Sequence, residues 1–456
     1  MLPVENRSLD SRVTPPCHHI GHRPVWWARR IPATPAGLWA RLTTGSFTGV
    51  MAEFLNTPWL PSMVVAGWFA WAYLHLRPSA SLSSSLHPSA AYGPWAYGHI
   101  AYSDTLSLYY SFHLANHALP YLDTRVEYPV LTGLFMWLAA WAPGVQGYFL
   151  ASSLGLLVCA LGTTYFLHRI DHRCAWAFAC CPLLLVYGLL NWDVLAIFLM
   201  VAGWERFRAE RYGWAGALLS LAVWAKFFPI VLFFYCVVSL VRDPRDRVHA
   251  RRMAAWGSVV ALLVNVPFAV CNLGNWDHFF VFNARRGGGG GLLYELHIAS
   301  ALSIAPADVL SGLIVVAAVI MLVPRVLRGG SPIAAAAMAF AVLLLVNKVY
   351  SPQYMLWLFV FGVLAEWPVW NLVLMSVAGF VDYGDAMMAL YLSHIHSPAF
   401  SWFFKTVYPW NGVLRYSSIG LALVGALVKW RQRPTSAVVW SPTQRSLPAD
   451  LERVAR

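Results

Sequence analysis

The sequence has little charge. Only 11% of its 456 residues are Asp, Glu, Lys or Arg, whereas 59% are hydrophobic. A water-soluble domain of this size needs more polar side chains to cover its surface. The sequence also lacks the apolar and polar alternation that marks half-buried strands. Since lipid cannot satisfy unpaired backbone groups, these two absences predict an all-α protein embedded in a membrane.

Familiar catalytic and metal-binding motifs are missing as well. The seven cysteines form no CxxC pair and lie mostly in apolar runs, which is typical of small core residues rather than of disulfides or metal ligands. The segment CHHIGH at 17–22 has no second ligand pair at zinc spacing. No HExxH, GxSxG or Walker pattern occurs, which argues against a metalloprotease, a serine hydrolase and an ATP-driven pump. We therefore expect no metal site.

Apolar runs are what the chain does have, and they recur along nearly its whole length. They predict a polytopic transmembrane helical bundle of about twelve spans within residues 58–429. The expected spans are 58–76, 148–168, 175–190, 193–204, 213–226, 227–241, 254–272, 308–324, 332–347, 353–365, 368–381 and 413–429. Several are short for a bilayer, so we expect broken or tilted helices around a water-filled cavity. The apolar segment 129–143 fits only as an interfacial or re-entrant helix.

Basic residues set the expected orientation. The 32 Lys and Arg outnumber the 20 acids, and they cluster at the ends of apolar segments. That placement indicates membrane topology rather than nucleic-acid binding. Residues 1–57, rich in Arg and Pro, are predicted to be a disordered cytoplasmic tail, with Met51 as an alternative start, and residues 430–456 a second cytoplasmic tail. The long loop after the first span, at 77–128, then lies outside and contains juxtamembrane helices.

Most remaining polar segments fall on the same, extracytoplasmic side in this topology. They are YSD at 102–104, EYP at 127–129, NWD at 191–193, AKFFP at 225–229, FNARRGGGGG at 282–291, NKVYSPQY at 347–354 and DYGD at 382–385. A transporter is expected to place ionisable groups near the midplane and to have two related halves. The sequence has no such repeat.

Asp104 is the best placed acid for catalysis. It begins an amphipathic stretch, SDTLSLYYSFHLANHA, whose apolar residues recur at helical spacing. The pattern predicts a helix lying on the membrane with Asp104 at or near its N-cap. A carboxylate shielded there by aromatic rings can take a proton from a hydroxyl group. Spacing alone favours a capping role equally.

Three further acids have alternative roles. Asp123 and Glu127 flank Arg125, and pairing with Arg125 is expected for Asp123. For Glu127, pairing and the binding of an acceptor hydroxyl both stay open. Asp193 begins a short helix, where an acid favours the helix dipole or caps the first turn.

Four cations on the expected outer side favour an anion site. Lys226 and Lys348 lie in apolar sequence, where a lysine needs a partner or must extend to the interface. Arg285 and Arg286 precede five glycines whose backbone N–H groups suit a phosphate, although such a run is also typical of a flexible loop. A carboxylate base with these cations suits transfer of a group from a lipid-linked phosphate.

The ordered segments YSD, PYLDTRVEYPVLTG, NWDVLAIFL, AKFFPIVL, FNARRG and NKVYSPQY resemble the GT-C membrane glycosyltransferases of the glycosyltransferase 87 type, from residue 58 to 429. EYP.LTG and NK..SPQY are the more specific motifs. The resemblance implies a cell-membrane enzyme that transfers a sugar of the mannose or arabinofuranose type from a polyprenyl-phosphate donor to a glycolipid or polysaccharide acceptor. Its site would face the periplasm or exterior, with no metal or other cofactor.

The resemblance places the catalytic acid at Asp104, in the first outer loop. Residue chemistry and these motifs together assign two further sets. The expected substrate ligands are Glu127, Asp193, Tyr350 and Gln353, and the expected donor-phosphate ligands are Lys226, Arg285, Arg286 and Lys348. Two other functions stay open: a translocase of lipid-linked sugars without transferase activity, and a structural membrane subunit that binds a partner through its polar loops.

Overall fold

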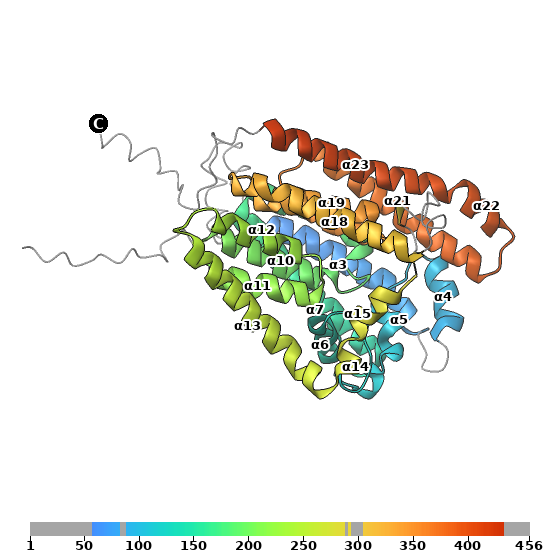
Figure 1. Cartoon of the computed structure of the whole chain (residues 1–456). Coiled ribbons are helices and arrows are strands. Elements are labelled where there is room, and N and C mark those ends of the chain that lie inside the picture. The colour runs from blue at the N-terminus through green and yellow to red at the C-terminus, as the bar shows by residue number, and fades with distance from the viewer. Residues whose placement is uncertain (1–56, 83–87, 288–290, 293–303, 433–456) are drawn as a thin grey trace, which may run out of the picture. The chain divides into compact units, whose positions relative to one another are not determined.

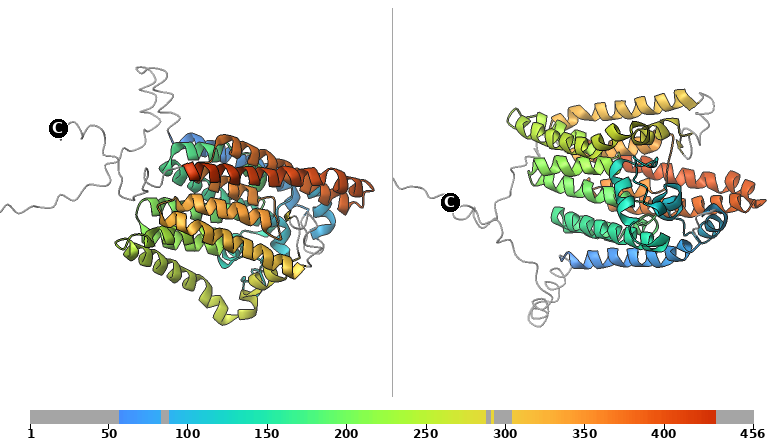
Figure 2. Two further views of the ribbon diagram at one scale, coloured as in Figure 1. Left: turned by 45° about the horizontal axis from the view of Figure 1, so that its top comes forward. Right: turned by 90° about the horizontal axis from the view of Figure 1, so that it is seen from below.

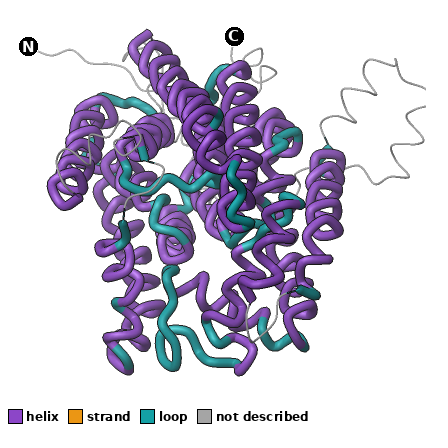
Figure 3. Tube along the Cα trace, turned by 90° about the vertical axis from the view of Figure 1, so that its right-hand side faces the viewer, coloured by secondary structure: helices purple, strands orange, loops and turns teal. Residues whose placement is uncertain are grey.

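The computed structural model describes residues 57–82, 88–287, 291–292 and 304–432. The chain divides into two units, Met1–Thr57 and Pro58–Arg456, and the following description concerns the second. The segment CHHIGH and most of the five-glycine run lie outside the described residues. Within the described ranges the regular elements are helices (Figure 3), which confirms the all-α prediction.

Five segments of the described part are long and apolar enough to cross a bilayer, as expected of a multi-pass membrane protein. They are Gly144–Ile170 (α7), Arg247–Cys271 (α13), Ala307–Leu327 (within α18, Ile304–Leu327), Val369–His394 (α21) and Ala399–Trp430, which combines α22 (Ala399–Thr406) with α23 (Tyr408–Gln432). Shorter apolar helices are α6 (Val130–Ala139), α11 (Tyr212–Ala225), α12 (Ile230–Val241), α19 (Pro332–Val346) and α20 (Tyr354–Leu364). The expected count of twelve crossings goes beyond these five and stays a prediction.

The remaining described helices precede these segments in the sequence or lie between them. They are α3 (Trp59–Ala80), α4 (Pro88–Gly98), α5 (Asp104–Ser111), η1 (Leu114–Asn116), α8 (His172–Ala179), α9 (Leu183–Tyr187), α10 (Asp193–Arg208), α14 (Leu273–Trp276) and α15 (His278–Arg285). The segment expected as one span at 175–190 is broken between α8 and α9. Pro182, which precedes α9, lacks the N–H that a continuous helix needs.

The end of α21 and the length of α6 can be compared with the spans expected from the sequence. The span expected at 368–381 was placed too short, because α21 continues through the DYGD segment to His394. The charged Asp382 suggests a membrane boundary in the sequence. In the structure it has a buried partner, described below, so the helix continues past it. At 1.5 Å per residue α6 extends for only about 15 Å, half of a bilayer's apolar thickness.

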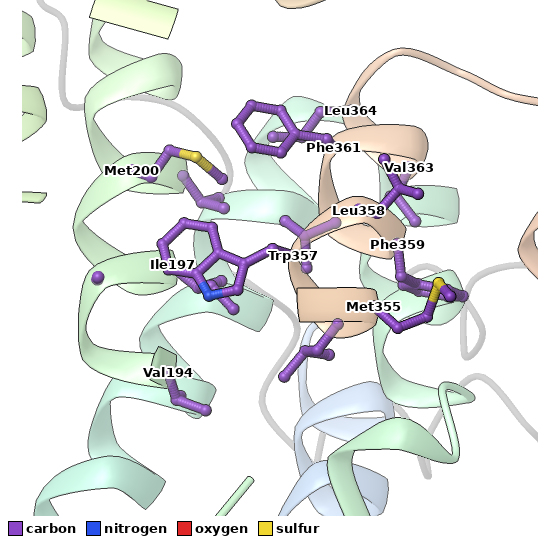
Figure 4. Packing of buried hydrophobic residues seen from close by; sticks show 14 of the residues in the cluster. Val194, Ile197, Met200, Met355, Trp357, Leu358, Phe359, Phe361, Val363 and Leu364 are labelled. Carbon is purple, nitrogen blue, oxygen red and sulfur yellow. The ribbon is translucent and has the colours of Figure 1, made fainter. Parts of the chain in front are cut away.

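The centre of the bundle is built on α10, which packs against α7 and α11, while α11 packs against α13. Figure 4 shows the indole of Trp357 on α20 pointing toward Ile197, with Val194 and Met200 along the same face of α10. Glycine permits the closest approach: a Cβ on Gly216 of α11 would fall 2.1 Å from the Met253 carbonyl of α13. Figures 1 and 2 place α13 at the edge of the bundle, where most of its side chains are not buried.

The helices α10, α19 and α20 run from one end of the bundle to the other. The two ends differ chemically. One end, here called the cavity end, gathers the segments 102–104, 127–129, 226–228, 282–286 and 347–354. The other, here called the basic end, gathers Arg208, Arg325 and Lys429. Segments separated by more than two hundred residues thus meet at each end, while the side of the membrane that each end faces stays a prediction.

Candidate active site

A cavity of about 800 Å³ opens at the cavity end. Its wall is formed by the start of α5, the segment before α6, the end of α11, the end of α15, the segment between α19 and α20, and part of α21. Aromatic rings make up much of this wall. Its charged or amide side chains include Asp104, Glu127, Lys226, Asn283, Arg286, Asn347, Lys348 and Gln353.

Asp104 is the first residue of α5, and its position is fixed through the backbone. Its N–H donates to the Leu190 carbonyl at 2.8 Å, and the preceding Ser103 hydroxyl donates to the Leu189 carbonyl at 2.7 Å. Ser103, rather than Asp104, is the N-cap residue. The start of α5 is therefore attached to the segment that leads into α10.

The Asp104 carboxylate accepts hydrogen bonds from two tyrosines instead of capping its own helix. The Tyr102 hydroxyl donates to Oδ1 at 2.9 Å and the Tyr128 hydroxyl to Oδ2 at 3.4 Å. Burial raises the pKa of Asp104 above its ordinary value, while the Tyr102 bond and the nearby charge of Lys226 act in the opposite direction. The site thus holds a carboxylate with a raised proton affinity at the cavity wall.

Lys226 provides a positive charge that acts on this carboxylate. It follows the last residue of α11 with extended backbone angles, where a positive charge also favours the helix dipole. Its ammonium group lies 2.8 Å from the fully buried Asp193 carboxylate. It also lies 5.4 and 5.8 Å from the ring centroids of Tyr128 and Tyr354, so ion pairing and two aromatic faces stabilise it.

Lys348 is the second lysine of the cavity, and it also has an acidic partner. Its ammonium group lies 2.8 Å from Asp308 Oδ2 of α18 and donates to the Ala284 carbonyl of α15 at 3.1 Å. The chain here is close to Gly291, whose Cβ, if it had one, would fall 2.2 Å from the Asn347 carbonyl. The last glycine of the five-glycine run therefore permits the approach to the lysine segment.

Glu127 and Arg286 lie in the same cavity wall. Burial raises the pKa of Glu127, and the positive charge of Arg286 opposes that shift. Asp123, by contrast, accepts a hydrogen bond from the Leu119 N–H at 2.8 Å. Its structural role is thus a backbone contact, where pairing with Arg125 was expected.

The structure brings six of the nine expected site residues into one cavity wall: Asp104, Glu127, Lys226, Arg286, Lys348 and Gln353. Asp193 stands behind Lys226 as its ion-pair partner. Tyr350 and Arg285 are not among the described residues that line the cavity. Arg285 is the last residue of α15, whereas Arg286 follows the helix with non-helical backbone angles, so the two neighbouring side chains take different directions.

Tyr350 belongs to a second polar cluster, buried between α21 and α23. Its ring centroid lies 4.4 Å from the guanidinium carbon of Arg415. Arg415 is ion-paired with Asp382, which also accepts from Asn411 Nδ2 at 2.8 Å. The side chains of Asp382 and Arg415 are 0% and 1% exposed, so this pair is closed to solvent.

Sequence reasoning passed over several residues of the site. Tyr102 and Tyr128 stand inside the YSD and EYP segments, and the signal was their position beside the acids. Asp308 is the partner that a lysine in apolar sequence requires. In the described ranges, no three or more His, Cys, Asp and Glu side chains gather closely enough to hold a metal ion.

These features define a multi-pass helical membrane protein with a polar, charged cavity at one end of the bundle. Residues 127–352 match the model of glycosyltransferase family 87, so the chain carries a domain of this family and is a glycosyltransferase by family membership. The match begins at Glu127 and includes Lys226, Arg286 and Lys348, while Asp104 lies upstream of it. No curated protein matches the chain.

Proposed function

We propose that the protein transfers a sugar from a polyprenyl-phosphate donor to a glycolipid or glycan acceptor, in a cell-membrane site open to the extracytoplasmic side. The main support is the meeting of one carboxylate, Asp104, with the cations Lys226, Arg286 and Lys348 in a single cavity. Mannose or arabinofuranose as the sugar is an expectation from the family resemblance.

Asp104 acts as the general base in this proposal. Its carboxylate takes the proton from an acceptor hydroxyl while that oxygen bonds to the anomeric carbon of the donor sugar. The bond from that carbon to the phosphate oxygen breaks, and the phosphate leaves with the electron pair. Tyr102 and Tyr128 hold the carboxylate toward the cavity, which fixes the base before the acceptor arrives.

The cations stabilise the departing polyprenyl phosphate. Lys226 and Lys348 are kept in place by Asp193 and Asp308, so their charges are fixed before the donor binds. The donor is a phosphodiester with one negative charge, and its phosphate gains a second as the bond to the sugar breaks. Preorganised positive charge therefore stabilises the departing phosphate more than the bound donor. Arg286 adds a planar guanidinium, which suits paired hydrogen bonds to phosphate oxygens.

Neutral and acidic groups bind the sugars. Glu127 and Gln353 line the same cavity, and their oxygens accept hydrogen bonds from sugar hydroxyls. Phenylalanine rings on the wall, among them Phe227 and Phe280, provide apolar surface for the sugar faces and the first isoprene unit. Tyr350 and Arg285 have no role in substrate binding in this proposal, because they lie outside the cavity wall.

The Asp104→Asn variant tests the proposal. Purified protein in proteoliposomes would be incubated with a panel of polyprenyl-phosphate sugars and glycolipid acceptors, with products followed by mass spectrometry. Loss of a general base lowers the rate by roughly 100-fold or more, so we expect glycoside formation to fall at least that far. The matched control is Asp277→Asn, at an acid outside the cavity wall, which should keep the parent rate.

Parent activity in Asp104→Asn would remove Asp104 from the role of base. Movement of labelled lipid-linked sugar across the bilayer, with no new glycosidic bond from any donor in the panel, would instead favour the translocase.

A further inference from the structure

Tyr121 is fully buried in the loop before α6 and is not among the residues that line the cavity containing Asp104. Its hydroxyl donates to the Pro129 carbonyl at 2.8 Å and is shared with the Tyr128 carbonyl at 3.0 Å. A single side chain thus fixes the backbone of the EYP segment at two successive residues. Tyr121 lies upstream of the family-matched region, and the proposed mechanism has not used it.

The backbone of Tyr121 is strained and is held by its neighbours. Its φ of +69° lies in the left-handed region, which a bulky residue rarely adopts and which persists only where surrounding contacts maintain it. The ring packs against Phe268 of α13, with 5.6 Å between the centroids. The next carbonyl, of Leu122, accepts from Asn272 Nδ2 at 3.0 Å and from Asn275 Nδ2 at 2.8 Å. The loop is therefore attached to α13 and α14 at Tyr121.

Gly133 of α6 provides the space that the Tyr121 hydroxyl occupies. A Cβ on Gly133 would fall 2.3 Å from that hydroxyl oxygen and 2.6 Å from the ring. Alanine is a better helix former than glycine, so helix propensity does not account for a glycine inside α6. The close approach of Tyr121 does account for it. The segment PYLDTRVEYPVLTG thus contains both members of this contact.

The backbone that Tyr121 fixes carries a side chain of the candidate site. The Tyr128 hydroxyl donates to Asp104 Oδ2 at 3.4 Å, and the Tyr128 ring centroid lies 5.4 Å from the Lys226 ammonium group. A hydroxyl donor and its acceptor usually lie closer than 3.0 Å. The bond from Tyr128 is therefore long, and a small displacement of this residue would break it.

We propose that Tyr121 is a positioning residue of the candidate active site. Its hydroxyl holds residues 128 and 129 so that Tyr128 keeps its hydrogen bond to Asp104 and its ring near Lys226. The consequence for catalysis rests on the proposed function, whereas the consequence for the Asp104 carboxyl does not.

The first readout is the protonation of Asp104, which does not depend on turnover. Dicyclohexylcarbodiimide modifies protonated carboxyl groups, and peptide mass spectrometry of the full-length protein measures its attachment at Asp104 across a pH series. The hydrogen bond from Tyr128 favours the ionised carboxylate and so lowers the pKa of Asp104. Tyr121→Phe removes the positioning hydroxyl, and Gly133→Ala displaces it. In both variants we expect the midpoint of labelling to move to higher pH by about half a unit.

A Tyr128→Phe background shows whether the effect passes through Tyr128. The donor is already absent there, so Tyr121→Phe should add no further shift. A further shift of the same size would overturn the proposed route. The other ionisable groups that interact with Asp104 are not substituted in these variants: Tyr92, Tyr97, Tyr102, Glu127, Asp193, Lys226 and Tyr383.

The second readout is turnover in the transfer assay. Misplacing a reacting group slows the chemical step more than it weakens substrate binding. We therefore expect Tyr121→Phe to lower kcat by about tenfold with KM near the parent value. The control is Tyr235→Phe, because the Tyr235 hydroxyl donates to the Val319 carbonyl at 2.8 Å from an equally buried ring outside the cavity wall. It should lose a similar amount of heat stability while keeping the parent midpoint and the parent kcat.

The outcomes separate this proposal from the proposed function. An unmoved midpoint in both Tyr121→Phe and Gly133→Ala would overturn the positioning role, as would an equal shift in Tyr235→Phe. A moved midpoint with the parent kcat in an active enzyme would overturn its consequence for catalysis. A moved midpoint in a protein that forms no glycoside from any donor would remove the proposed function and leave Tyr121 as a positioning residue for Asp104.

Discussion

Two buried ion pairs, Asp193 with Lys226 and Asp382 with Arg415, show two uses of charge in an apolar bundle. Both acids are 0% exposed. Lys226 keeps 16% of its side chain exposed and lines the cavity that contains Asp104, whereas Arg415 is 1% exposed. Lysine presents a compact charge to a ligand, while the planar guanidinium of Arg415 bonds Asp382 and stacks on Tyr350.

Under the proposed function, the Asp193–Lys226 pair serves the reaction and the Asp382–Arg415 pair serves the fold. Asp382 and Arg415 join α21 to α23 and do not line the cavity that contains Asp104. Ionisable groups within spans are expected of a transporter, but a closed pair offers no path for a substrate. The Asp382 pair therefore supports a structural role, and it also holds Tyr350, two residues from Lys348.

Breaking the closed pair should have the largest effect. Arg415→Met leaves Asp382 buried without its counterion, which typically costs about 3–5 kcal/mol of stability. We expect little folded protein by size-exclusion chromatography after heating in detergent. In the double variant Asp382→Asn/Arg415→Met no charge is left unpaired, so most of the stability should return. A double variant as unstable as the single one would contradict this account.

Breaking the cavity pair should reverse the pattern. Asp193→Asn/Lys226→Met removes both charges and should stay folded, because no charge is left buried alone. The phosphate of the donor loses a preorganised cation, so we expect the rate to fall by about 100-fold. Transfer assays and heating curves on the same preparation check both results. Parent activity in this folded variant would show that the two pairs do not differ in use.

The smallest effect should come from the hydrogen bond between Tyr102 and Asp104. Burial raises the pKa of Asp104, so activity should fall as pH falls through that raised value and the base becomes protonated. Tyr102→Phe removes a donor that favours the ionised form. We expect the acidic limb of the pH–rate profile to move to higher pH by about one unit.

Tyr110→Phe on the same helix is the control, and its limb should not move. An unmoved or more acidic limb in Tyr102→Phe would contradict the assignment. A carboxyl whose pKa is raised by folding stabilises the protein below its ordinary pKa and loses that contribution as pH rises through the raised value. Asp104→Asn should therefore be at least as stable as the parent at neutral pH.

Much of the fold could be predicted from local composition. Apolar runs gave the helices, and the break at Pro182 agrees with the expectation of interrupted spans. The end of α21 was missed, since the sequence around Asp382 reads as a polar boundary until its distant partner Arg415 is known. A charge buried by a partner 33 residues away has no local signal.

The candidate site was predictable where chemistry and motif agreed. Lys226 and Lys348 stood out because charge in an apolar run requires a reason. The sequence of a loop does not show which way neighbouring side chains point, so Arg285 was predicted to bind substrate together with Arg286, and Tyr350 together with Gln353. Arg286 and Gln353 line the cavity, and only the packing of α15 and α23 in the structure shows this difference.

The backbone bonds from Ser103 and Asp104 to Leu189 and Leu190 bear on what the smallest working enzyme is. The family-matched region starts at Glu127. The Leu190 carbonyl, inside that region, accepts the N–H of Asp104, the proposed base, which lies before it. A chain shortened to the matched region would lose the proposed base and leave two backbone carbonyls before α10 without their hydrogen-bond donors. The unit that the proposed mechanism needs therefore extends beyond the family-matched residues, and genes designed for expression should retain the α3 to α5 segment.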